Sequence, residues 1–148
     1  MKKLALVLAI LSLVVLAVGC GKSPESCYLD SLHDQMKFLA DSLDSVTEDM
    51  RVSEASLASL KGNMEVQLAA WHQTYQEALA TDPPPRYQAL HDSWLAVLEL
   101  GESWTTDKIS CLEKEEPLGS DCWTQTEVKM LQLTTELDKM SDIVDQLR

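Results

Sequence analysis

The sequence has few basic residues and few histidines. It contains 12 lysines and arginines, 24 aspartates and glutamates and 3 histidines, so the formal net charge is −12. Such an excess of acid repels nucleic acid and anionic lipid headgroups, and we expect no nucleic-acid partner. The acids alternate with apolar residues instead of forming one tail, which is typical of a solvated face.

The sequence also lacks the short motifs that carry common chemistry. It has no glycine-rich phosphate loop, no Gly-x-Ser-x-Gly motif and no Cys-x-x-Cys-His motif. His33, His72 and His91 fall outside the apolar stripes described below. Asp30 and His33 have the spacing of one Glu-x-x-His pair of di-iron bundles, but such sites need a second pair, and Gln88 stands where His91 would need an acid. We expect no metal site, no cofactor and no enzymatic activity.

Only one long hydrophobic run is present, at the amino terminus. Lys2 and Lys3 precede residues 4–18, which are apolar apart from Ser12. Fifteen residues are too few for a membrane span, which needs about 20. A basic start followed by a short apolar segment is typical of an export signal, which we exclude from the fold. Without the two lysines of this leader, 10 basic residues face 24 acidic ones, for a net charge of −14.

The end of the leader, residues 17–20 (AVGC), resembles the lipobox of bacterial lipoproteins. The resemblance implies that residues 1–19 are a signal peptide and that Cys20 becomes the lipidated amino terminus. Two or more acyl chains attach a protein stably to a membrane. The expected location is the bacterial cell envelope, on the outer side of the cytoplasmic membrane or on the outer membrane.

The residues that follow the anchor predict helices. Residues 20–24 form a short tether and residues 25–148 one domain, whose first helix is capped by Ser23 and begins around Pro24. Apolar residues then recur in heptad steps of three and four, as in coiled coils. This heptad stripe comprises Leu29, Leu32, Met36, Leu39, Leu43, Val46 and Met50. The pattern resumes at Leu57, Leu60 and Met64 and then drifts through Leu68, Trp71, Tyr75 and Leu79, a spacing that suits a straighter helix with neighbours on more sides.

Two polar segments divide the rest of the chain. Three consecutive prolines end the helical pattern at residues 81–86, and residues 113–121 contain a proline and a glycine. The helix between them carries Tyr87, Leu90, Trp94, Val97, Leu98, Gly101 and Trp104, and the last helix Trp123, Thr126, Met130, Leu133, Leu137, Met140, Val144 and Leu147. No segment has the pattern of a strand.

The fold class is therefore all-α, an antiparallel up-and-down bundle of four or three helices. A single helix over residues 25–80 would be about 80 Å long, and two later helices of about 43 Å would leave its first half bare. A break between residues 50 and 63 removes this difficulty and favours four helices. Gly62-Asn63 is the best local breaker, and a turn near Met50–Ser53 would give helices of nearly equal length.

The cysteines have different predicted roles. Cys111 and Cys122 flank the last turn, where the ends of two antiparallel helices are neighbours, so we predict a disulfide. Cys27 is expected at the opposite end of the bundle. It is left as a free thiol, an intermolecular link or a small buried residue.

The function follows from the anchor more than from any motif. An acylated cysteine followed directly by heptads resembles small envelope lipoproteins, which implies a structural or protein-interaction module that docks a partner protein or forms a homo-oligomer. The alternative is a small-ligand-binding bundle with an aromatic cleft. Its lining would be Trp71, Tyr75, Trp94 and Trp104, although at helical spacing such rings more often fill the core.

Overall fold

The computed structural model describes residues 23–52, 57–116 and 120–147, and within these ranges it contains four long helices. They are α2 (Pro24–Val52), α3 (Leu57–Leu79), α4 (Gln88–Glu113) and α5 (Asp121–Leu147), with a short 3-10 turn, η1 (Pro85–Tyr87), before α4. No strand occurs in these three ranges. The all-α prediction with four helices is confirmed.

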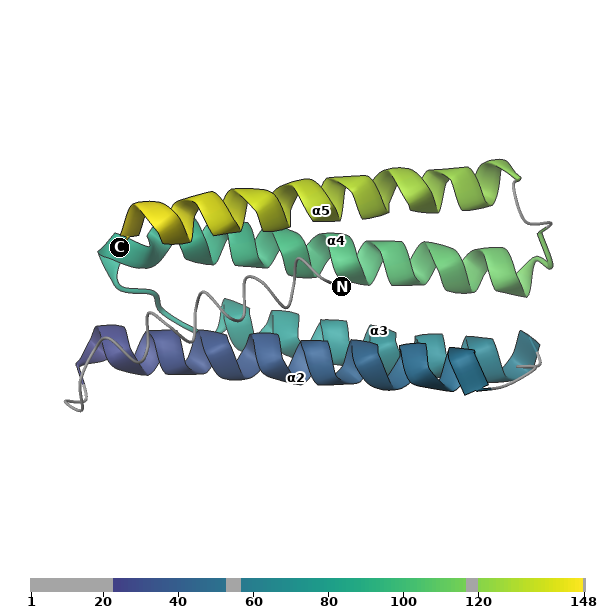
Figure 1. The fold of residues 1–148 in the computed structure, drawn as a ribbon, viewed down its shortest axis with the longest axis horizontal. Coiled ribbons are helices and arrows are strands. Elements are labelled where there is room, and N and C mark those ends of the chain that lie inside the picture. The colour runs from purple at the N-terminus through teal and green to yellow at the C-terminus, as the bar shows by residue number, and fades with distance from the viewer. Residues whose placement is uncertain (1–22, 53–56, 117–119, 148) are drawn as a thin grey trace.

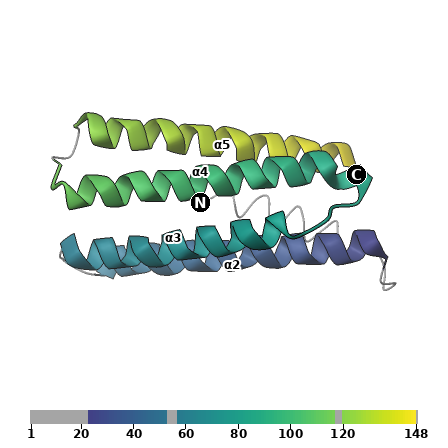
Figure 2. The ribbon, with the colours of Figure 1, turned by 180° about the vertical axis from the view of Figure 1, so that it is seen from behind.

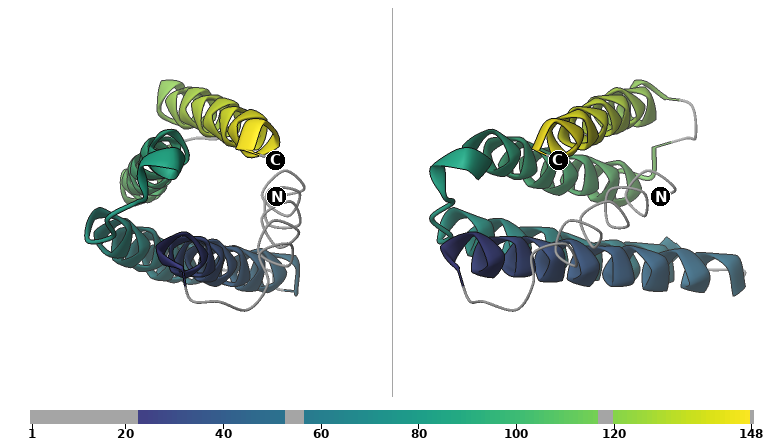
Figure 3. Two further views of the ribbon diagram at one scale, coloured as in Figure 1. Left: turned by 90° about the vertical axis from the view of Figure 1, so that its left-hand side faces the viewer. Right: turned by 60° about the vertical axis from the view of Figure 1, so that its left-hand side comes forward.

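The helices run alternately up and down (Figure 1), and seen end-on they form a curved row (Figure 3). Neighbours in sequence pack on one another: α2 on α3, α3 on α4 and α4 on α5. Viewed along the helices, α2 and α5 occupy the two ends of this row (Figure 3). Within the described ranges, the backbones of α2 and α5 make no close contact.

The predicted break between the first two helices has a definite position. Because α2 ends at Val52 and α3 begins at Leu57, the three-helix alternative is wrong. Gly62-Asn63 lies inside α3, so the prediction that it breaks the helix is also wrong. One glycine costs a helix only about 1 kcal/mol, which packing along α3 can offset. Ser53, the predicted cap, lies outside the described residues.

The apolar stripes meet in one core to which all four helices contribute. Leu29, Leu32, Met36 and Leu39 of α2 are buried there, as are Leu133, Leu137, Met140 and Val144 of α5. A smaller cluster around Met64, Ile109 and Leu112 lies toward the α4–α5 turn. The stripe positions Leu43, Val46, Met50 and Leu57 lie outside the described side chains.

The stripe of α3 is rotated relative to the prediction. Leu79 is exposed, whereas Ala78, Thr74 and Gln67 are buried. The predicted stripe advances by 3, 4, 4, 3, 4 and 4 residues, so it drifts slowly around a helix that turns once in 3.6 residues. Because α3 lies between α2 and α4, its buried side is also wider than a two-helix seam.

One end of the bundle gathers the start of α2, the segment that links α3 to α4, and the end of α5 (Figure 2). Ser23 caps α2 by accepting a hydrogen bond from the Ser26 amide at 3.2 Å. Arg86 donates to the carbonyl oxygen of Leu147 at 2.6 Å, which places a cation at the carboxyl end of α5. None of the described helices has a stretch long and apolar enough to cross a membrane.

Candidate functional site

Cys27 and the Cys111–Cys122 pair lie at opposite ends of the bundle, because the start of α2 and the α4–α5 turn are at opposite ends (Figure 1). Cys111 ends α4, Cys122 begins α5, and the two form a disulfide with their Cα atoms 5.9 Å apart. Cys27, in the first turn of α2, is an exposed free thiol, so the prediction of a small buried residue is wrong. An intermolecular link through this thiol stays a prediction. Cys20 lies outside the described residues.

The turn closed by this disulfide is held by further contacts. The Trp123 indole donates to the carbonyl oxygen of Glu116 at 3.0 Å. The Glu116 amide in turn donates to the carbonyl oxygen of Cys111. Glu115 adopts a positive φ of 50°, which lets the chain leave α4. Together with the disulfide, these contacts hold the end of α4 close to the start of α5.

Two of the four tryptophans lie in the middle of the core. Trp71 and Trp94 are 1% and 0% exposed. Gly101 is in close contact with Trp71, because a Cβ built on Gly101 would lie 2.5 Å from the indole ring. Trp104 is half-buried on the surface, where the ammonium of Lys108 sits 4.1 Å from its ring centroid.

A buried hydrogen bond links α2 to a core tryptophan of α4. The Trp94 indole donates to the amide oxygen of Gln35 at 2.9 Å. Gln35 is only 7% exposed. Its burial was not predicted, because the residue is polar and the apolar stripe of α2 contains its neighbour Met36 instead. The amide nitrogen of Gln35 donates to the Ser31 hydroxyl at 3.5 Å. Gln35 therefore joins α2 to α4 across the row.

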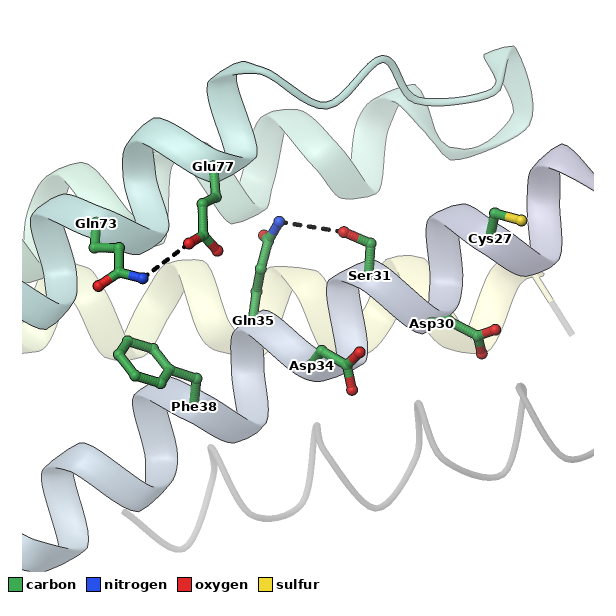
Figure 4. A pocket seen from close by; sticks show the side chains of 8 residues that line it. All are labelled: Cys27, Asp30, Ser31, Asp34, Gln35, Phe38, Gln73 and Glu77. Carbon is green, nitrogen blue, oxygen red and sulfur yellow. Dashed lines mark hydrogen bonds between the residues drawn. The ribbon is translucent and has the colours of Figure 1, made fainter.

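A groove of about 570 Å³ lies between α2 and α3 (Figure 4). The side chains that line it are mostly polar: Cys27, Asp30, Ser31, Asp34, Gln35, Phe38, Gln73 and Glu77. Three of these carry carboxylates and none carries a positive charge, so the groove disfavours anionic ligands.

The groove is also not the predicted aromatic cleft. Trp71, Tyr75, Trp94 and Trp104 do not line it. Binding of a small ligand by these four residues stays a prediction. No cluster of three or more histidine, cysteine or carboxylate ligands suited to a metal ion occurs among the described residues.

His91 lies in the core, although it is outside the predicted apolar stripe. His91 is buried, with its ring centroid 5.9 Å from that of Tyr28. Burial lowers the pKa of His91, and the carboxylates of Asp92 and Asp82 oppose this effect. Burial also raises the pKa of the Tyr28 hydroxyl, which has no hydrogen-bond partner in the described part of the chain. The stripe pattern predicted that Leu90 is buried. It did not predict that the next residue, His91, is buried as well.

Ion pairs connect neighbouring helices outside the core. Lys61 of α3 pairs with Glu113 of α4 at 2.8 Å, and Lys129 of α5 pairs with Asp107 of α4 at 2.5 Å. The hydrogen bond to Glu113 raises the pKa of Lys61. Such exposed pairs add little stability, but they help to fix which helices are neighbours.

Apolar side chains are exposed mainly on α5. Six large apolar residues are exposed in the described ranges, and three of them fall within one turn of this helix: Val128, Met130 and Leu131. Sequence reasoning placed Met130 in the core stripe, but the side chain is 37% exposed. Because α5 is an end helix of the row and packs only on α4, part of its circumference stays in solvent.

The chain matches no model of a protein family, no curated protein and no solved structure.

Proposed function

We propose that this protein is a bacterial lipoprotein, anchored by acyl chains on Cys20, whose helical bundle serves as a structural or protein-docking module of the cell envelope. The position of α2 is the main support. This helix begins at Pro24, so only residues 21–23 separate it from Cys20. An extended chain of this length reaches at most about 14 Å, which would hold the bundle at the membrane surface.

The arrangement of the helices suits a module presented from a membrane. The end of the bundle next to the anchor also contains the α3–α4 connection and the end of α5 (Figure 2). The disulfide-closed turn is at the other end, about 40 Å away along a helix of the length of α5. A bundle that stands on its anchored end would expose the sides of its helices to partners along this length.

The exposed apolar residues of α5 support a protein as the partner. Val128 and Leu131 are 53% and 68% exposed on a chain that is otherwise rich in surface acids. Exposed apolar residues grouped in this way are typical of protein interaction sites. The proposed partner is therefore a protein, either a different one or a second copy of this chain, which docks on a helix face.

Replacing Cys20 tests the anchor. The full-length chain and its Cys20→Ser variant would be expressed in bacteria with radiolabelled palmitate. We expect label in the parent chain and none in Cys20→Ser, because the serine oxygen does not form the thioether. Cys27→Ser is the matched control, since it removes the nearest other cysteine, and it should keep the label. An unlabelled parent chain, or label that persists in Cys20→Ser, would contradict the proposal.

A further inference from the structure

The exposed side of α5 carries a second heptad stripe. Thr124, Val128, Leu131 and Thr135 are all exposed, and their spacings are 4, 3 and 4 residues. These positions lie on one face, opposite the face that buries Leu133 and Leu137. We call these four residues the outer stripe. In heptad terms they are successive d, a, d and a positions.

The residue types of the outer stripe fit one kind of pairing. Its centre has Val128 at an a position and Leu131 at a d position. A β-branched residue at a with leucine at d favours two parallel strands in a coiled coil. Thr135, at the next a position, is also β-branched. The same pattern on a second helix would be self-complementary.

The charges beside the outer stripe permit such a pairing over a limited length. In a parallel pair, Glu127 of one helix would lie near Gln132 of the other, so no like charges meet. The next positions of the same register are Asp121 and Asp138. In a pair of copies, each of these aspartates would lie close to its equivalent. The repulsion between like charges limits the favourable contact to the residues between Asp121 and Asp138.

We propose that the outer stripe pairs with the outer stripe of a second copy of this chain, parallel and in register, when both copies are anchored in one membrane. This inference rests on the proposed function. A common anchor gives both copies the same end toward the membrane, and a twofold axis along the membrane normal keeps equivalent helices parallel.

The small size of the contact makes the anchor necessary for this pairing. The outer stripe spans about 18 Å of helix, and four contact positions are far fewer than the ~20 residues per partner of a standard interface. The pair would therefore be weak in dilute solution. Confinement to a membrane raises the effective concentration of the second copy, as linkage does for tethered domains.

Disulfide cross-linking in intact envelopes tests the arrangement. Single cysteines would replace Thr124, Leu131 and Thr135 in the full-length chain that carries Cys27→Ser, and mild oxidation would be followed by non-reducing electrophoresis. A parallel, in-register pair brings each position next to its own equivalent, so all three variants should form dimers. Gln76→Cys, exposed on α3, is the control and should stay monomeric.

A disrupting substitution provides a second measurement. Adding Leu131→Asp to the Thr124→Cys reporter should lower the cross-linked fraction several-fold, because it places two carboxylates in the seam. Leu131 is 68% exposed, so the fold should be retained, which circular dichroism would check. An unchanged cross-linked fraction would contradict the proposal.

The other outcomes separate this inference from the proposed function. Dimers from Leu131→Cys but not from Thr124→Cys or Thr135→Cys would indicate an antiparallel pair and overturn the proposal. Adducts with a different protein would overturn the second copy as the occupant while supporting a docking role. Palmitate labelling of the same samples shows whether the chain is acylated. Label without cross-links would overturn this inference alone. Absence of label would overturn the proposed function on which the inference rests.

Discussion

At the residue scale, the most informative side chain is His91. It is 5% exposed and lies beside Tyr28, within the end of the bundle that faces the expected anchor. A buried imidazole is held neutral, because the charged form would lose its hydration. Its position one residue after Leu90 shows how a helix in contact with several neighbours buries more than a single stripe.

His91 should make the stability of the bundle depend on pH. Since its folded pKa lies below the ordinary value of 6.5, the folded chain binds fewer protons than the unfolded chain. The stabilisation is present above about pH 6.5 and is lost as the pH falls below that value. Urea unfolding at pH 7.5 and 5.5 should show a smaller fall in stability for His91→Gln than for the parent chain.

The exposed histidine His72 provides the control for this measurement. His72 lies on the surface, 2.9 Å from Glu102, so His72→Gln should leave the burial of His91 unchanged. That variant should keep the fall in stability at pH 5.5. Equal falls in the parent chain and in His91→Gln would contradict the role given to His91.

At the scale of the elements, the close approach of α3 and α4 depends on one absent side chain. Gly101 allows the indole of Trp71 to lie directly on the backbone of α4. The other described glycine, Gly62, has open space where a Cβ would be. The same residue type therefore has a packing role in α4 and no such role in α3.

The two glycines form a matched pair for mutation. Gly101→Ala should destabilise the bundle by about 1–3 kcal/mol, because the new methyl group overlaps the ring of Trp71. Gly62→Ala should stabilise it by up to about 1 kcal/mol, since alanine is the better helix former and meets no neighbour. Urea or thermal unfolding followed by circular dichroism would measure both. If Gly101→Ala were as stable as Gly62→Ala, the close approach would be wrong.

At the scale of the whole molecule, the bundle is a row that is fixed at both ends. Cys111–Cys122 joins α4 to α5 at one end, and the Arg86–Leu147 hydrogen bond joins the α3–α4 connection to α5 at the other. These contacts hold α5 in place although only α4 packs along its length. Because α5 has only one neighbouring helix, its ends are held by these two contacts. For the same reason its other side, which carries the outer stripe, is exposed.

Removing the disulfide should lower the stability of the whole domain. Cys111 and Cys122 are 11 positions apart, and closing a loop of this size contributes roughly 3 kcal/mol in the chain-entropy model. We expect a loss of this order in the Cys111→Ser/Cys122→Ser variant by urea unfolding. Cys27→Ser, which removes an exposed thiol, should unfold like the parent chain. A double variant as stable as the control would contradict a structural role for the bridge.

The sequence by itself determined the helical fold class, the disulfide and most of the core. Heptad spacing, proline breaks and short turns are local signals. They specified the buried faces of the described part of α2, most of α4 and most of α5, because each of these helices has one dominant apolar stripe. The tertiary structure decided what depends on neighbouring helices. It buried Gln35 and His91, exposed Leu79 and Met130, and left one side of α5 uncovered. These features depend on the order and crossing of helices in space, and a periodic pattern along one helix does not contain that information.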